Sequence, residues 1–191
     1  MSKTSKSVIA AGMLSVFGLL AAATGMAQQS PGTPERRDGQ RDFDFNVGTW
    51  DTHIRRLQQP LSGSSAWVQL NGTVTVHPIW DGRAQIEEIE ADGATGHFEG
   101  LTLFLYNPDS HQWTQTYASS RSGSLNSSLT GAFKDGRGEL IGLDQHAGRT
   151  ILVRTVWSDI KPDSHRFEQS FSEDGGKTWE PNFVATLTRV H

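Results

Sequence analysis

The side chains that could perform acid/base or metal chemistry are scattered along this sequence. Its seven histidines are His53, His77, His97, His111, His146, His165 and His191. No two of them are separated by one or by three residues, the spacings at which neighbouring imidazoles can share a metal ion. The sequence therefore predicts no metal site.

The segment EEIE, residues 87–90, is the densest group of carboxylates. Strand alternation places Glu87 with Ile89 on one face and Glu88 with Glu90 on the other. Paired carboxylates can serve acid/base catalysis, but a charged strand face exposed to water is the simpler interpretation. The chain contains no Gly-x-Ser-x-Gly nucleophile motif. These observations favour a protein that is not an enzyme.

Almost every segment after residue 42 has the alternation of a β-strand. In WVQLNGTVTVH, residues 67–77, mostly apolar positions alternate with polar ones, as in a half-buried strand. About ten such segments are separated by turns that contain Asp-Gly or Asn-Pro. Short consecutive strands close best as a barrel, because closure removes exposed edges. We therefore expect an all-β domain over residues 43–191, a single antiparallel up-and-down β-barrel of about ten strands.

The two ends of this predicted domain carry a further pattern. FDFNVGTWDTHIRRL places Gly48 and Trp50 at the start of the first strand, and FVATLTRVH places Arg189 near the end of the last. The pattern resembles that of lipocalins and fatty-acid-binding proteins, the calycins, in which a Trp of the first strand packs beneath an Arg of the last. This resemblance implies that the three residues close one end of a calycin-like barrel.

Alternation also indicates which polar side chains face the barrel interior. With Arg189 directed inward, Gln169 shares the inward face of the preceding strand, Gln115 and Tyr117 share another, and Arg56 lies toward the opposite mouth. Arg154 lies in ILVRTVW, whose two faces are similarly apolar, so its direction stays open.

An apolar cavity with a few converging polar groups is typical of a small-molecule site. The candidate ligand-binding residues are Arg56, Gln115, Tyr117, Arg154 and Gln169, which would hold the polar end of an apolar or amphipathic molecule. The alternative is that the amides and the phenol hydrogen-bond to one another or to the backbone in a filled core.

The motif SEDGGKTW, residues 172–179, resembles the Asp-box hairpins of sialidase propellers. A propeller repeats the motif in several blades, whereas this chain contains it once. Asp174 can accept hydrogen bonds from N–H groups just ahead of it, and Gly175 and Gly176 tolerate left-handed backbone angles. We therefore predict a hairpin between the last two strands, with Trp179 packed near the barrel rim.

Residues 1–27 have the pattern of a secretory signal peptide: Lys3 and Lys6, the apolar run VIAAGMLSVFGLLAAA, and small residues up to Ala27. Its removal leaves 164 residues, the usual size of one domain. Residues 28–42 are rich in Gln, Pro, Gly and charge, which predicts a flexible leader. The chain has no cysteine, and export without disulfides fits a soluble periplasmic or secreted protein.

The charge of the mature chain bears on its partners. Without the two signal-peptide lysines, 15 basic residues face 21 acidic ones, a formal net charge of −6. An acidic chain without a Lys/Arg-rich face argues against nucleic acid and anionic membranes as partners. The apolar run, residues 8–23, is short for a membrane span, so no span is expected in the mature chain.

Five segments extend the resemblance over nearly the whole mature chain: FDFNVGTWDTHIRRL, DSHQW, GRTILVRTVW, FEQSFSEDGGKTWEPNF and a final TR. In this order they are similar to a family of secreted bacterial proteins classed as a domain of unknown function, with a lipocalin-like barrel. The resemblance implies the fold and export, and no particular reaction.

Nitrobindin-like haem proteins also carry a Gly-Thr-Trp near the start of the barrel. Their pattern continues Gly-x-Gly where this chain has Asp-Thr-His at residues 51–53, and their iron-binding His opens the last strand, where this chain has Asn182. These departures disfavour haem, so no cofactor is expected.

The sequence thus favours an exported protein that binds a small apolar or amphipathic molecule. A second hypothesis is an enzyme that acts on a small hydrophobic substrate through His53, Glu87 or Tyr117. A third is a cell-envelope interaction module without a ligand, which a filled barrel and an exposed apolar patch would favour.

Overall fold

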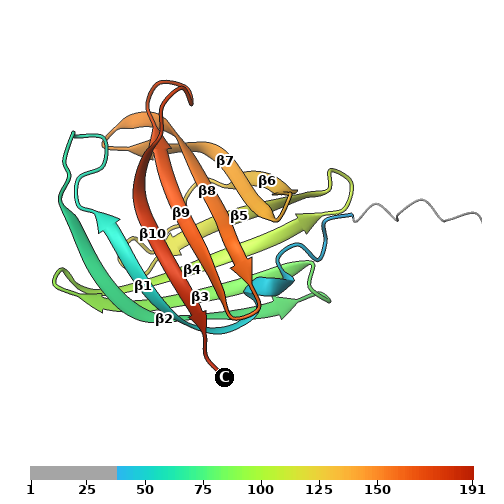
Figure 1. The fold of residues 1–191 in the computed structure, drawn as a ribbon. Coiled ribbons are helices and arrows are strands. Elements are labelled where there is room, and N and C mark those ends of the chain that lie inside the picture. The colour runs from blue at the N-terminus through green and yellow to red at the C-terminus, as the bar shows by residue number, and fades with distance from the viewer. Residues whose placement is uncertain (1–37) are drawn as a thin grey trace, which may run out of the picture. The chain divides into compact units, whose positions relative to one another are not determined.

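A computed structural model describes residues 38–191 of the chain. This part forms one closed antiparallel barrel in which each strand pairs with its sequence neighbours and β1 pairs with β10 (Figure 1). The strands are β1 (Gly48–Leu57), β2 (Trp67–Ile79), β3 (Ala84–Gly93), β4 (Gly96–Asn107), β5 (Gln112–Ser119), β6 (Leu129–Lys134), β7 (Arg137–His146), β8 (Arg149–Lys161), β9 (Ser164–Ser172) and β10 (Glu180–Arg189). A 3-10 helix, η1 (Asp44–Asn46), precedes them. The predicted all-β up-and-down barrel of about ten strands is confirmed.

The burial of β1 follows the alternation expected of a barrel strand. Trp50, Thr52 and Ile54 are buried, and the residues between them are exposed. Two irregularities interrupt the ladders, one in β8 between Ser158 and Lys161 and one in β10 after Pro181. The barrel interior is therefore lined by every second residue, as the sequence predicts.

Trp50 and Arg189 join the first and last strands at one end of the barrel. Trp50 is fully buried, and the Arg189 guanidinium carbon lies 4.0 Å from the centroid of its indole ring. The indole Nε1 donates a hydrogen bond of 2.8 Å to the Asn46 carbonyl. Arg189 donates hydrogen bonds of 2.9 Å to three backbone carbonyls, those of Phe45, Val47 and Pro162. The guanidinium therefore holds η1 to the barrel, and Figure 1 shows η1 at one end of the strands.

Gly48 leaves room for this guanidinium. Its backbone has a φ of 124°, which side-chain-bearing residues rarely adopt. A Cβ atom at this position would lie 2.6 Å from Arg189 Nη1. The glycine before the tryptophan thus has a steric role in the closure.

The residues just before η1 are bonded to the barrel. The Tyr106 hydroxyl donates a hydrogen bond to the Asp38 carbonyl, and Trp113 Nε1 donates one of 2.9 Å to the Gly39 carbonyl. Residues 38–42, the last five of the predicted flexible leader, therefore belong to the folded part. The predicted signal peptide, residues 1–27, and residues 28–37 lie outside the described residues.

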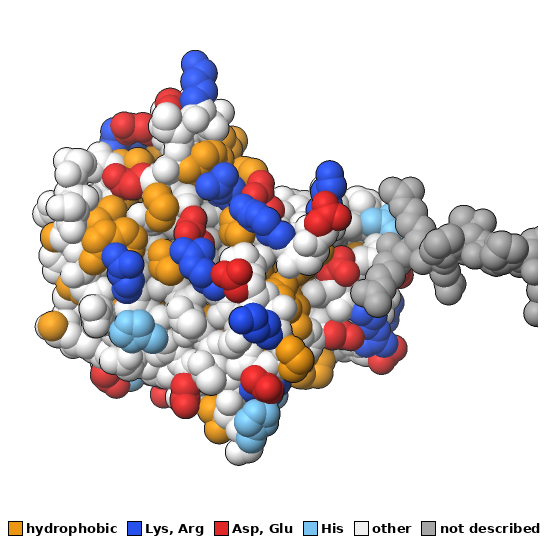
Figure 2. Space-filling model, viewed as in Figure 1, with side chains coloured by type: hydrophobic (Ala, Val, Ile, Leu, Met, Phe, Trp, Pro, Cys, Tyr) orange, Lys and Arg blue, Asp and Glu red, His pale blue; other side chains and the backbone are white. Residues whose placement is uncertain are grey.

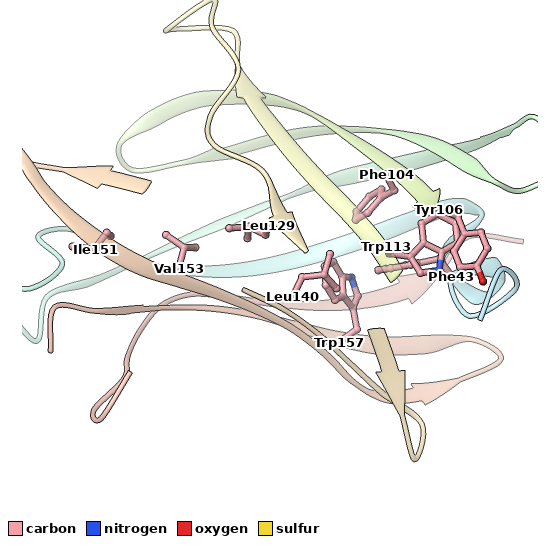
Figure 3. Packing of buried hydrophobic residues seen from close by; sticks show 9 residues of the cluster. All are labelled: Phe43, Phe104, Tyr106, Trp113, Leu129, Leu140, Ile151, Val153 and Trp157. Carbon is pink, nitrogen blue, oxygen red and sulfur yellow. The ribbon is translucent and has the colours of Figure 1, made fainter. Parts of the chain in front are cut away.

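Phe43 fills one side of the barrel interior. It is fully buried, and its ring centroid lies 4.9 Å from that of Phe104, 5.0 Å from Trp113 and 4.8 Å from Trp157. Figure 3 shows these rings gathered together, with aliphatic side chains of the same cluster extending away from them. A second apolar cluster is contributed by β1, β2, β3 and β10. The interior near Phe43 is therefore packed solid.

The β9–β10 hairpin has the bonding that its sequence predicts. The two carboxylate oxygens of Asp174 accept hydrogen bonds from the backbone N–H of Thr178, at 2.9 Å, and from its hydroxyl, at 2.6 Å. Ser172 Oγ also donates to Asp174, at 2.8 Å. These hydrogen bonds hold the pKa of Asp174 well below its usual range. Gly175 and Gly176 have φ values of 73° and 87°.

The outer surface carries charges of both signs. On the face shown in Figure 2, basic and acidic side chains lie interspersed, and that face has no continuous basic stripe. One such pair is Arg166 and Glu168 on β9, with 2.6 Å between Nη2 and Oε2. No helix within residues 38–191 is long and apolar enough to cross a bilayer.

Candidate functional site

A cavity of about 220 Å³ lies inside the barrel. Half of the residues that line it are apolar or aromatic: Val74, Ile89, Phe98, Trp157, Phe167, Phe183, Ala185 and Leu187. The other half are polar: Thr52, Arg56, Glu87, Thr102, Gln115, Tyr117, His165 and Gln169. This composition is that of a small-molecule site, in which an apolar wall carries a few polar groups.

The structure brings together four of the five candidate ligand-binding residues. Arg56, Gln115, Tyr117 and Gln169 all line the cavity. Arg154 does not, because it points out of the barrel.

The position of Arg154 follows from the alternation in β8. Val153 and Thr155, the residues on either side of it, are buried. The Arg154 guanidinium carbon lies 4.4 Å from the centroid of the Trp179 ring. Arg154 thus packs against the β9–β10 hairpin on the outer face of β8. It is not a residue of the candidate site.

Arg56 lies where the cavity meets the surface. It borders both the cavity and a second, outer hollow of about 410 Å³, as do Gln169 and Phe183. Its Nη2 donates a hydrogen bond of 3.4 Å to Thr95 Oγ1, and its guanidinium carbon lies 5.9 Å from the centroid of the Phe98 ring. We identify this region as the mouth of the cavity.

Gln115 and Tyr117 project from β5 and line the cavity. Thr155 Oγ1 donates a hydrogen bond of 2.8 Å to Gln115 Oε1, so the amide oxygen already has a partner within the protein. Burial raises the pKa of the Tyr117 phenol above its ordinary value. The phenol is therefore protonated near neutral pH and can donate a hydrogen bond to a ligand.

Glu87 faces the interior, not the solvent. Thr102 Oγ1 donates a hydrogen bond of 3.1 Å to Glu87 Oε1, and Asn46 Nδ2 donates one of 3.3 Å to Oε2. Burial raises the pKa of this carboxyl, and the two hydrogen bonds oppose that effect. The exposed-face interpretation of residues 87–90 holds for Glu88 and Glu90, which are exposed, and is wrong for Glu87.

His165 lines the cavity and was not among the candidate binding residues. Its side chain is packed edge-on against Trp50 and Phe45, with ring centroids 4.5 Å and 5.1 Å away. Burial, together with the positive charge of Arg189, lowers the pKa of His165 to about 4. The imidazole is therefore neutral at neutral pH. Strand alternation could have predicted that His165 faces the interior, because it has the same parity as Gln169 on β9.

The other residue proposed for acid/base chemistry, His53, lies outside the barrel. It is exposed on β1, and its Nδ1 atom is 2.7 Å from Asn71 Oδ1 on β2. It cannot act on a molecule in the cavity. Within the described part of the chain, no group of three His, Asp or Glu side chains is placed to hold a metal ion.

Comparisons with known proteins support the architecture alone. No family model matches the chain, and no curated protein matches it. Among solved structures, the chain is similar to the S-type phycobiliprotein lyase CPES from Guillardia theta, with a TM-score of 0.57 and 12% identity over 83% of this chain and 98% of that one.

Two designed proteins match less well. A de novo designed fluorescence-activating β-barrel has a TM-score of 0.42 and 14% identity, over 77% of this chain and 95% of its own. A redesigned β-barrel has a TM-score of 0.43 and 13% identity, over 79% of this chain and 96% of its own. The fold of this chain is a closed antiparallel up-and-down β-barrel.

Proposed function

We propose that this protein is exported and binds a small apolar or amphipathic molecule inside its barrel. The observation that carries the proposal is the cavity of about 220 Å³ with its apolar wall and converging polar groups. An apolar cavity of about 150 Å³ accepts benzene, and sites for drug-sized ligands begin near about 300 Å³. The cavity volume lies between these two values, so the cavity can hold a ligand with one ring or a short chain. A filled barrel would have favoured the third hypothesis, an interaction module without a ligand, and this cavity does not favour it.

The polar residues at the mouth suggest how such a ligand is held. Arg56 is the one cationic side chain among the residues that line the cavity. Gln169 also borders the mouth, with Phe183 between the two in the strand register. A carboxylate or another polar group of the ligand would bind there through charge-assisted hydrogen bonds. The apolar part would then contact Phe183 at the mouth and, further inside, Ala185 and Leu187.

Replacing Arg56 tests this arrangement. We expect the Arg56→Leu protein to bind 3-phenylpropanoate and medium-chain fatty acids at least about tenfold more weakly than the wild type, because a charge-assisted hydrogen bond is lost. Arg55→Leu is the matched control, since Arg55 is exposed on the same strand and its guanidinium carbon lies 4.9 Å from the Trp67 ring centroid. Isothermal titration calorimetry gives the affinities. Equal losses in the two variants would contradict a role for Arg56 in the site.

A second measurement tests binding and export together. Native mass spectrometry of the protein purified from its own host should show a retained small molecule. N-terminal sequencing of the same sample should begin at Gln28, because cleavage is expected after Ala27. An empty protein that also binds none of the probes would contradict the binding proposal, and an intact N-terminus would contradict export.

A second candidate function is proton transfer on a small carbonyl compound. The observation that favours it is that Glu87 and Tyr117 line the same apolar cavity, and that burial raises the pKa of both groups. In this reaction the Glu87 carboxylate takes a proton from the carbon next to the carbonyl. The C–H electron pair forms an enolate, whose oxygen accepts a hydrogen bond from the phenol. Return of a proton to carbon completes the step without an oxidant.

Deuterium exchange tests this second candidate. The protein in D₂O is expected to speed deuterium incorporation next to the carbonyl of 4-phenyl-2-butanone, measured by NMR, and Glu87→Gln is expected to abolish the effect because the amide is not a base. Glu88→Gln is the matched control, since Glu88 is the exposed neighbour on β3. Exchange no faster than in protein-free buffer would exclude this function for the ketone tested and leave the binding proposal intact.

A further inference from the structure

Two buried polar atoms in the wall of the cavity lack a hydrogen-bond partner within the described residues: Thr52 Oγ1 and His165 Nδ1. Thr52 is 4% exposed and His165 is 3% exposed. Buried polar atoms are nearly always hydrogen-bonded to protein, water or ligand. Both residues line the cavity, so a molecule inside it is the available partner.

Strand register places these two residues in one row across three strands. Thr52 on β1 lies opposite Leu187 on β10, which in turn lies opposite His165 on β9. The row is next to the closed end, because His165 contacts Trp50 and Phe45 there. The same contacts fix the plane of the imidazole ring. Thr52 and His165 thus form one polar subsite at the inner end of the cavity.

The charged groups near this subsite already have partners. The Arg189 guanidinium donates to the carbonyls of Phe45, Val47 and Pro162. Both oxygens of Glu87 accept hydrogen bonds from side chains, those of Asn46 and Thr102. The groups left for a ligand are a hydroxyl and an imidazole that is neutral at neutral pH. The subsite therefore complements an uncharged polar group, since an ion here would be buried without a counter-ion of its own.

We infer that Thr52 and His165 bind an uncharged hydroxyl group at the inner end of the ligand. A hydroxyl can donate one hydrogen bond and accept another, so it matches His165 Nδ1 in either tautomer and Thr52 Oγ1 at the same time. This inference rests on the proposed binding function and narrows its ligand class. The ligand is a small amphipathic molecule with an anionic or polar end at Arg56 and a hydroxyl at the opposite end.

A pair of matched probes tests the inference. We compare 3-(4-hydroxyphenyl)propanoate with 3-(4-methylphenyl)propanoate, which replaces the hydroxyl by a methyl group of similar size, by isothermal titration calorimetry. The wild type is expected to bind the hydroxyl compound about tenfold more tightly, because the methyl compound leaves both buried atoms without a partner. In Thr52→Val and His165→Phe the ratio of the two affinities is expected to fall toward one.

The control is Thr186→Val, which removes a hydroxyl from the outer face of β10, where Thr186 is exposed. This variant should keep the wild-type ratio. Equal binding of the two probes by the wild type, or an unchanged ratio in both cavity variants, would overturn the inference and leave the proposed function standing, because both probes would still bind. Failure of both probes, together with every fatty acid, would instead contradict the proposed function itself.

Discussion

Replacing Arg189 by leucine is expected to lower the free energy of unfolding by about 3–4 kcal/mol. The substitution removes hydrogen bonds from a charged donor to three carbonyls, those of Phe45, Val47 and Pro162, and hydrogen bonds to charged groups contribute about 1.5–3 kcal/mol each. It also removes the cation–π contact with Trp50, worth about 0.5–2 kcal/mol. Partial exposure of Arg189 keeps the total below the sum of these values, because water can reach part of the site.

Urea unfolding followed by tryptophan fluorescence measures this loss. Arg166→Leu is the matched control, because Arg166 lies on the neighbouring strand and forms an ion pair with Glu168 on the outer surface. That change should cost less than about 1 kcal/mol. Arg189→Lys keeps the positive charge but lacks the planar set of N–H donors of a guanidinium. It should give an intermediate loss in the free energy of unfolding. If Arg189→Leu costs no more than Arg166→Leu, the closure of the barrel does not depend on this residue.

The closure shows what the sequence could predict well. Trp50 and Arg189 are 139 positions apart, and it is the resemblance to the calycin pattern that pairs them. The predicted topology agrees with this pairing, because an up-and-down barrel must bring its first and last strands together. Alternation then assigns most inward side chains without further information. The contribution of η1, whose carbonyls accept the hydrogen bonds of both residues, could not be predicted, because a single turn of helix has no periodic pattern.

Alternation failed where tertiary contacts cover the outer face of a strand. In β8 the sequence has apolar residues at both parities, and the outward residue Val156 is 5% exposed. The β9–β10 hairpin covers another part of the same outer face, because its Trp179 ring lies over Arg154. A strand that is buried on both faces loses the alternation that would identify its inner side.

The interior polar groups were the least predictable part of the site. Glu87 shares its face of β3 with the buried Ile89. Its carboxylate accepts hydrogen bonds from Thr102 and from Asn46, which lies 41 residues earlier in the chain, and alternation does not predict these partners. His165 has the parity of an inward residue, but parity does not reveal that Trp50 and Phe45 enclose it. Sequence alternation thus indicates which side chains face the interior, whereas their chemical state depends on long-range packing.

His165 should make the stability of the protein depend on pH. Its pKa is lowered from an ordinary value of 6.5 to about 4 in the folded protein. Between these values the unfolded chain binds a proton that the folded protein does not, so the free energy of unfolding falls as the pH decreases from about 6.5 to about 4. At about 1.4 kcal/mol for each pH unit, the His165 contribution amounts to about 3 kcal/mol, fully present above the unfolded pKa.

Three other groups with altered pKa values act in the same or a neighbouring range. The hydrogen bond with Asp92 raises the pKa of His97, so its contribution to stability is lost as the pH rises above the ordinary value of 6.5. Glu87, which also lines the cavity, has a raised pKa, so its effect has the opposite sign: stability is lost as the pH rises above the ordinary value of 4.5 toward the folded pKa. Asp174 has a lowered pKa, so its contribution is lost below its ordinary value of 3.8. The pH profile of the wild type alone therefore does not isolate the histidine.

The difference between the wild type and His165→Phe isolates it, because Glu87 and Asp174 are present in both proteins. Phenylalanine keeps the contacts with Trp50 and Phe45 and does not titrate. We expect the stability of the wild type relative to the variant to fall by about 3 kcal/mol between pH 7 and pH 4, measured by urea unfolding at each pH. His53→Gln, which removes an exposed histidine outside the barrel, is the control for the loss of an imidazole. A flat difference for His165→Phe would mean that the imidazole is hydrated or hydrogen-bonded in the folded protein, which would also remove the basis for treating its Nδ1 as lacking a partner.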